Sequence, residues 1–107
     1  MPDGFFERRM AGVIDRLTRA GYSEIFRAEA AGVCALHAGH CHAPEELVIE
    51  SIDRFEGISD PADEAMVLAL RCPVDGCRGT YTLPYGKNMP SIDAEMVARI
   101  PDARRRC

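Results

Sequence analysis

Hydrophobic positions near the amino terminus recur every three or four residues, the spacing of one face of an α-helix. Charged residues fill most of the positions between them, and Gly21 follows where a helix commonly ends. The pattern predicts an amphipathic helix whose apolar side chains belong to the core rather than to a cofactor site. The residues of this stripe are Phe6, Met10, Val13, Ile14 and Leu17.

A second helical pattern lies near the carboxy terminus. Its apolar stripe comprises Ile92, Met96, Val97 and Ile100. Ser91 precedes the stripe as a favourable N-cap residue, and Pro101 cannot continue a helix. The sequence therefore predicts a helix between Ser91 and Pro101.

Short apolar runs between the two helical patterns predict strands. Ile25–Ala28 and Val33–Leu36 flank a turn of small residues that ends in Gly32, which indicates a hairpin. A loop over residues 37–44 follows, and residues 44–46 are expected to form a single helical turn. The first half of the chain thus supplies two strands and a long loop.

Three further strands are expected in the second half of the chain. In "LVIESIDRFEG" the hydrophobic phase changes after Ile49, which predicts a bulge near Ser51. "AMVLALRC" is continuously apolar for six residues, as in a central strand covered on both faces, although a short buried helix has the same pattern. "RGTYTLPYG" alternates, and Pro84 favours an edge position for that strand.

These elements predict an α+β fold, in which an N-terminal and a C-terminal helix flank an antiparallel sheet of about five strands. The strands are expected to form an up-and-down meander with both helices on one face. A chain of 107 residues is long enough for one domain and too short for two. We expect a single domain over residues 1–103 and a short basic tail over residues 104–107.

Charge and hydropathy limit the class of partner. The net charge of −4 gives nucleic-acid binding no electrostatic support, and the arginines of the tail are weak evidence for a polyanion. No run approaches the about 18 apolar residues of a membrane span, and the first residues lack the apolar core of a signal peptide. The sequence therefore predicts a cytoplasmic protein, monomer or homodimer, without a membrane or nucleic-acid partner.

The stretch "VCALHAGHCHAPEELV" brings cysteines and histidines together. Zinc takes four such ligands, usually as two pairs from two short loops. In a cytoplasmic protein, clustered cysteines are expected to be reduced and to act as ligands or redox groups. Candidates for the first pair are Cys34, His37, His40, Cys41 and His42, and the second pair comes from Cys72 and Cys77 of "CPVDGC".

A meander would place both cysteine-bearing loops at one end of the sheet, within reach of one zinc ion. We predict Cys72 and Cys77 as one ligand pair, and as the other either Cys34 with His37 or Cys41 with a neighbouring histidine. Three alternatives stay open. Cys34 can be a small buried hydrophobe, Cys72 and Cys77 can form a reversible redox pair, and the same cysteines can serve a small metal-dependent enzyme.

The stretch "RFEGISDPADEA", with the later "G" and "YG" positions, resembles a family of small uncharacterised bacterial proteins of about this length. The resemblance covers roughly residues 10–100 and implies no established activity. Some members are labelled phosphoribosylpyrophosphate synthetase, which is a much larger two-domain enzyme. The matching residues are Arg54, Phe55, Glu56, Gly57, Ser59, Asp60, Pro61, Asp63, Ala65, Ala69, Leu70, Gly79, Tyr85 and Gly86.

The sequence favours a small binding or accessory module over an enzyme. A structural zinc site would stabilise so short a domain, and the partner would be a protein or a small molecule. The rival hypothesis is a thiol redox protein or a small metal-dependent enzyme that uses the same cysteines. The carboxylates of "EGISDPADE" either hold Mg²⁺ or Ca²⁺ or serve as ordinary turn residues.

Overall fold

The computed structural model describes residues 2–56, 64–84, 86 and 89–105, and they form an α+β fold. The part of the chain that it describes contains no helix long and apolar enough to cross a membrane. Its elements are α1 (Pro2–Arg19), β1 (Glu24–Glu29), β2 (Gly32–Ala35), β3 (Cys41–His42), the 3-10 turn η1 (Pro44–Glu46), β4 (Val48–Glu56), β5 (Glu64–Arg71), β6 (Arg78–Pro84), α2 (Ser91–Arg99) and the 3-10 turn η3 (Ala103–Arg105).

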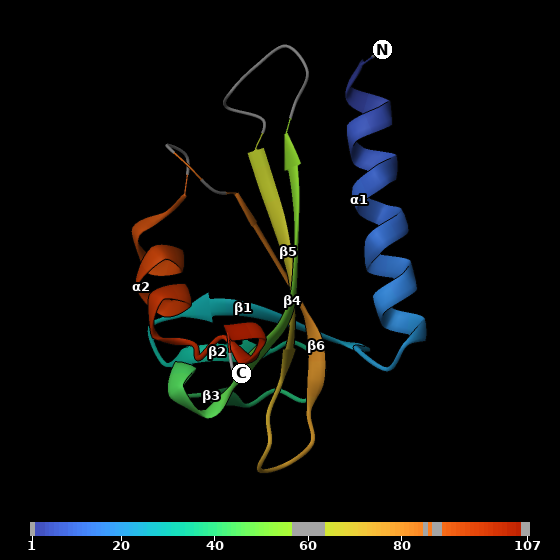
Figure 1. Ribbon diagram of the computed structural model, residues 1–107. Helices are drawn as coiled ribbons and strands as arrows, with labels where there is room; N and C mark the ends of the chain where they lie inside the picture. The colour runs from blue at the N-terminus through green and yellow to red at the C-terminus, as the bar shows by residue number, and fades with distance from the viewer. Residues whose placement is uncertain (1, 57–63, 85, 87–88, 106–107) are drawn as a thin grey trace.

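The six strands form one mixed sheet in the order β3-β2-β1-β6-β5-β4 (Figure 1). β1 and β6 pair in parallel, and the other neighbouring strands are antiparallel. The α+β class is therefore confirmed, whereas the expected all-antiparallel meander is wrong. Hydrophobic periodicity reports which residues are buried, but it does not report which distant strand lies beside them.

Pro84 does not mark an edge strand, because β6 has a neighbour on both sides. β1 pairs with β6 only along Gly79–Tyr81. Pro84 lies at the far end of β6, beyond this stretch, so its missing N–H removes no hydrogen bond to β1. A proline is tolerated in this interior strand because β1 is shorter than β6 and does not reach Pro84, so the predicted edge position is wrong.

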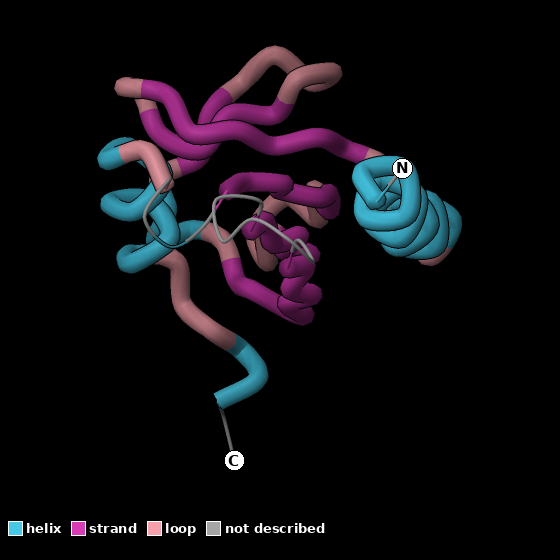
Figure 2. The backbone as a smooth tube through the Cα atoms, turned by 90° about the horizontal axis from the view of Figure 1, so that it is seen from above, coloured by secondary structure: helices cyan, strands magenta, loops and turns pink. Residues whose placement is uncertain are grey.

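The two helices cover opposite faces of the sheet, as Figure 2 shows from above. The expectation that both lie on one face is wrong. β5 is buried on both faces, which confirms its prediction as a central strand and explains why each face needs a helix. Met66, Leu68 and Leu70 belong to the cluster that includes Met96 of α2, and Val67 and Ala69 belong to the cluster that includes Leu17 of α1.

Several local predictions are confirmed. The register of β4 against β5 shifts between Ile49 and Ser51, where the bulge was expected. β1 and β2 form the predicted hairpin, and η1 is the predicted single turn. Ser91, however, is the first residue of α2 and Pro90 takes the cap position without a side-chain hydrogen bond, so the N-cap prediction is off by one residue.

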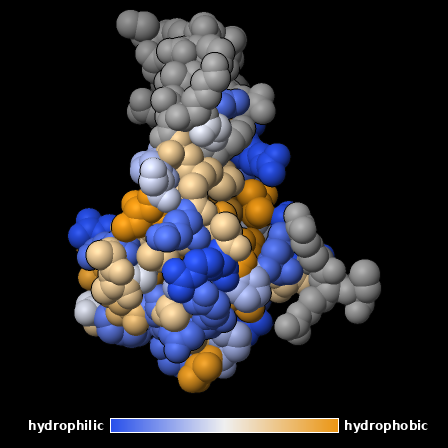
Figure 3. All heavy atoms as spheres, turned by 90° about the vertical axis from the view of Figure 1, so that its left-hand side faces the viewer, coloured by the Kyte–Doolittle hydropathy of each residue, from blue (hydrophilic) through white to orange (hydrophobic). Residues whose placement is uncertain are grey.

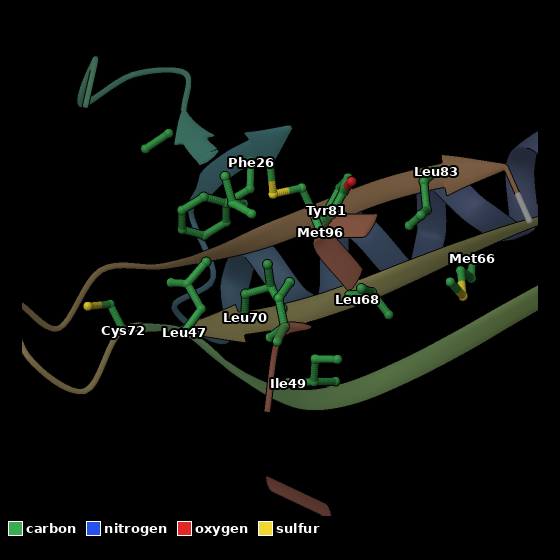
Figure 4. Packing of buried hydrophobic residues seen from close by; sticks show 13 residues of the cluster. Phe26, Leu47, Ile49, Met66, Leu68, Leu70, Cys72, Tyr81, Leu83 and Met96 are labelled. Carbon is green, nitrogen blue, oxygen red and sulfur yellow. The ribbon is translucent and has the colours of Figure 1, made fainter. Parts of the chain in front are cut away.

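α2 is attached to the sheet through packing and through a hydrogen bond. Met96 packs among core residues that Figure 4 shows in a row along the sheet, with Cys72 at one end. Within this core the Tyr81 hydroxyl donates a hydrogen bond to the Asp93 carboxylate of α2. Burial, and then the adjacent Asp93 carboxylate, raise the pKa of Tyr81, so the hydroxyl keeps its proton and acts as the donor.

On the face of the sheet that carries α1, a polar cluster joins Tyr22, which follows the helix, to β4 and β5. The Tyr22 hydroxyl donates to Glu50 Oε1 at 2.5 Å, and Arg71 Nε donates to Glu50 Oε2 at 2.7 Å. The hydrogen bond from Tyr22, followed by the one from Arg71, holds the pKa of Glu50 below its usual value. Glu50 therefore stabilises the fold in its charged form.

Glycine substitutions test the close approach of β1 to β6. An added Cβ at Gly79 would lie 2.3 Å from the Glu24 carbonyl oxygen, whereas one at Gly12 in α1 meets nothing within 4 Å. We expect Gly79→Ala to lower the free energy of unfolding by about 1–3 kcal/mol and Gly12→Ala to raise it by about 0.5–1 kcal/mol. Urea unfolding of both variants measures the two changes in free energy. Equal changes for Gly79→Ala and Gly12→Ala would contradict the close approach of β1 to β6.

The pH dependence of stability tests the Glu50 cluster. Because the pKa of Glu50 is lower in the folded state, its contribution is present above the unfolded pKa of about 4.3 and is lost as pH falls through the folded value. Glu50→Gln should therefore be less stable than the wild type at pH 7, and the two should converge in acid. Urea unfolding from pH 7 downward measures the difference, which a pH-independent gap would contradict.

Candidate metal centre

Two segments that are far apart in the sequence bring three possible metal ligands together. His40 directly precedes β3, His42 is the last residue of β3, and Asp75 comes from the turn between β5 and β6. The Nε2 atoms of the histidines lie 3.3 Å apart. Asp75 Oδ2 lies 2.9 Å from His42 Nε2 and 3.5 Å from His40 Nε2.

Strand geometry gives the two histidines a common face. They are two positions apart, so they lie on one side of β3 while Cys41 lies on the other. β3 is held beside β2 by the pair Val33↔His42 and by a 2.9 Å hydrogen bond from the Ala35 amide to the His40 carbonyl. Gly32 permits this approach, since its φ is +132° and an added Cβ would lie 2.4 Å from the His42 carbonyl oxygen.

The turn "CPVDGC" orients Asp75 toward the histidines. The Cys72 amide donates to the Cys77 carbonyl at 2.7 Å, and the Cys77 amide donates to Asp75 Oδ1 at 2.8 Å. Asp75 Oδ2 thereby remains directed at His42. The Cys77 amide, then His42 and the Cys72 thiol, hold the pKa of Asp75 far below its usual value, so Asp75 is a carboxylate near neutral pH.

The three side chains differ in exposure. The His42 side chain is 5% exposed and its ring packs edge-on against Phe26, with ring centroids 6.0 Å apart. His40 and Asp75 are 52% and 42% exposed. Nδ1 of His42 is buried without a hydrogen-bond partner among the described residues. The group is therefore anchored by one buried imidazole and open to solvent on its outer side.

The spacing of the three atoms matches that of a tetrahedral metal centre. A zinc ion with bonds of about 2.0–2.1 Å separates two of its ligands by roughly 3.3–3.4 Å. The observed separations of 2.9, 3.3 and 3.5 Å bracket that value. A shared cation can therefore contact all three atoms with small adjustments of the side chains.

Protonation of the two Nε2 atoms decides what holds this group together. If both Nε2 atoms carry protons, both N–H groups face Asp75 Oδ2, at 2.9 and 3.5 Å. If only His42 Nε2 is protonated, it donates to Asp75, and the lone pair of His40 Nε2 belongs to a ring that is 52% exposed. If neither Nε2 atom is protonated, all three atoms act as electron-pair donors, which is the arrangement that a cation stabilises.

The structure gives the predicted ligands other partners. Cys34 and Cys41 are joined in a disulfide, although reduced cysteines were expected. Cys72 is a buried free thiol, and Cys77 is a half-buried one. His37 Nδ1 lies 3.1 Å from Glu24 Oε1, outside the histidine–carboxylate group. The structure does not bring these five residues together as one ligand set.

The two loops that were expected to share a metal do meet. His40 and His42 were among the candidates for the first ligand pair, but Asp75 was missed. It stands between the two cysteines of "CPVDGC", just before a glycine, and so matches an ordinary turn residue. A search that admitted carboxylates beside the cysteines would have included it.

No protein-family model matches the chain, and neither a curated protein nor a solved structure matches it significantly. The family resemblance carried by "RFEGISDPADEA" therefore stays a prediction. Most of the carboxylate loop in that motif, residues 57–63, lies outside the described residues.

The reactivity of the cysteines tests their assignment. Burial, and then Asp75, raise the pKa of Cys77, which lowers the fraction of reactive thiolate. With iodoacetamide at pH 7.5 we expect Cys77 to react more slowly than a free cysteine peptide and Cys72 to react only after unfolding. The experiment uses the Cys107→Ser variant, which lacks the last cysteine of the chain, and mass spectrometry locates each label. Rapid labelling of Cys72 in the folded protein would contradict its burial.

Proposed function

We propose that the protein is a small module that binds a divalent transition metal, zinc foremost, through His40, His42 and Asp75. The observation that carries the proposal is the convergence of three donor atoms at separations of 2.9–3.5 Å. Two of them are imidazole nitrogens 3.3 Å apart, and both face the Asp75 carboxylate. This ligand set differs from the cysteine set that the sequence predicts.

The chemistry of the ligands favours zinc over magnesium or calcium. The latter two ions prefer all-oxygen coordination, whereas imidazole nitrogen suits zinc, copper, iron and nickel. Three ligands from the protein leave an outer position for water or for a group from a partner. Such an open position fits a binding or accessory module whose partner completes the coordination.

Metal binding would also connect separate parts of the sheet. β3 is a two-residue edge strand, and the β5–β6 turn belongs to the other half of the fold. A ligand that binds only the folded state adds to its stability. A bound ion at this junction would therefore hold the edge strand against the turn.

The proposal is tested by zinc binding to matched histidine and aspartate variants. We expect about one zinc ion per chain, and His42→Ala or Asp75→Asn should weaken binding at least tenfold because each removes a ligand. His37→Ala should bind as the wild type, since His37 lies in the same loop as His40 but contacts Glu24 of β1. Competition with a chromophoric chelator measures the affinities, and elemental analysis gives the stoichiometry.

Asp75→Asn is the informative variant at that position. Asparagine keeps an oxygen that can accept the Cys77 amide, so the turn is retained while the anionic ligand is removed. Zinc retained at full affinity in this variant but lost in Cys72→Ser would overturn the proposal in favour of the cysteine ligands.

A further inference from the structure

The disulfide lies on the opposite face of the same strand from the metal ligands. Cys41 is the first residue of β3 and stands between His40 and His42 in this extended segment, so its side chain points away from theirs. It is paired directly with Cys34 of β2, which in turn is paired with Arg27 of β1. Arg27, Cys34 and Cys41 thus form a row across three strands.

One of the two cysteines of the disulfide is exposed to solvent. Cys41 is exposed, whereas Cys34 is 6% exposed. A hollow of about 190 Å³ adjoins both cysteines and is also lined by Arg27, Glu29, Leu36 and Gly39. Arg27 is 67% exposed and is paired with Glu29 at 2.9 Å. A small molecule can therefore approach the disulfide from the exposed Cys41 side, through a hollow that presents both the Arg27 guanidinium and the Glu29 carboxylate.

Few other contacts hold the strand that bears the histidines. β3 has two residues and a single neighbouring strand, β2. The disulfide closes the segment from Cys34 to Cys41, a separation of seven positions that includes His40. Cross-linking so short a segment removes alternative arrangements of the turn and keeps the histidines in one geometry.

We infer that Cys34–Cys41 is a redox-active disulfide that small thiols reduce by attack on Cys41, and that its state sets the affinity of the histidine–aspartate site for metal. The second part rests on the proposed function. The first part stands on the placement of the disulfide alone. Small thiols, of which glutathione is the probe, are the expected co-reactants.

The exchange proceeds in two balanced steps. The thiolate of one small-thiol molecule attacks Cys41 Sγ, the protein S–S bond breaks, and the electron pair goes to Cys34 Sγ, which takes a proton from solvent. A second thiolate attacks the small-thiol sulfur of the mixed disulfide, and the Cys41 thiolate leaves and is protonated. Two thiols are oxidised to one disulfide, and the protein disulfide is reduced to two thiols.

Packing favours Cys34 as the sulfur released first. Cys34 Sγ lies 3.8 Å from the Gly32 carbonyl oxygen, which can accept a weak hydrogen bond from the thiol once it forms. Arg27 stands opposite Cys34 in the register, and its ion pair with Glu29 lines the hollow beside the disulfide. Cys41, the exposed partner, then carries the mixed disulfide.

The exchange chemistry is tested with two variants in a Cys107→Ser background, each of which keeps one cysteine of the disulfide together with Cys72 and Cys77. Oxidised glutathione should modify Cys41 in Cys34→Ser at least tenfold faster than it modifies Cys34 in Cys41→Ser, because Cys41 is exposed and Cys34 is buried. Mass spectrometry follows the mixed disulfide with time. Equal rates, or modification of neither cysteine in proteins shown to be folded by circular dichroism, would overturn the redox part.

The coupling is tested by the zinc affinity of the full chain in both redox states. The wild type is compared as the disulfide and after reduction with a phosphine that is removed under anaerobic conditions. We expect zinc to bind about tenfold more weakly to the reduced protein and equally weakly to Cys34→Ser/Cys41→Ser, because the histidines are no longer preorganised. By linkage, zinc should make the disulfide harder to reduce by the same factor.

The remaining outcomes separate the two proposals. Zinc that binds the oxidised and reduced proteins equally overturns the coupling and leaves the metal site intact. Tighter binding after reduction, with sulfur-to-metal charge-transfer bands when cobalt replaces zinc, overturns the coupling because the thiolates have become ligands. An oxidised protein that binds no zinc overturns the proposed function, while the glutathione experiment still decides the redox part.

Discussion

The parallel pairing of β1 with β6 is the constraint on which the rest of the structure depends. It joins the N-terminal hairpin to the three C-terminal strands, and it requires the Glu24 backbone to pass against a residue without a side chain, Gly79. Because β1 and β6 run in the same direction, the turn before β6 and the start of β1 lie at the same edge of the sheet. Antiparallel pairing would place them at opposite edges.

The candidate metal centre is a consequence of this pairing. β2 returns alongside β1, so the turn after β2 reaches the edge at which β1 starts, and Glu24 accepts hydrogen bonds there from the His37 and Ala38 amides. The turn that carries Asp75 arrives at the same edge from β5. Two segments more than 30 positions apart thus meet without a long loop. On the face that carries α2, hydrophobic spheres lie in separate spots among hydrophilic ones (Figure 3).

The sequence predicted local features of the fold better than strand pairing. The continuous apolar run of β5 and the phase change in β4 each have a local cause, and both were confirmed. The position of β6 between β5 and β1 depends on contacts across about half of the chain, and no local pattern encodes it. The same limit explains why the helices were assigned to one face. An apolar run indicates that both faces of the strand are buried, but it does not indicate which helix packs on which face.

The meeting of the two loops was easier to predict than the residues that face each other there. The expected meander brought these loops together for an incorrect reason, because parallel pairing of β1 with β6 has the same effect on the two turns. Cys34 and Cys41 drew attention as ligands, yet the register of β2 against β3 places them directly opposite each other. Asp75 carried no signal of its own, since its orientation is created by the Cys77 amide within the folded turn.

The two chemical features of the hairpin are connected by the alternation of a single strand. In β3, adjacent residues point to opposite faces, so the disulfide and the histidine pair share a backbone but not an environment. His42 faces the core beside Phe26, where it is held firmly, while Cys41 faces solvent, where a thiol can reach it. Reduction of the disulfide on one face of this short strand would therefore loosen the arrangement of the histidines on the other face. A longer strand would make more backbone hydrogen bonds to β2 and would be held in place without the disulfide. Reduction would then have a smaller effect on the position of the histidines.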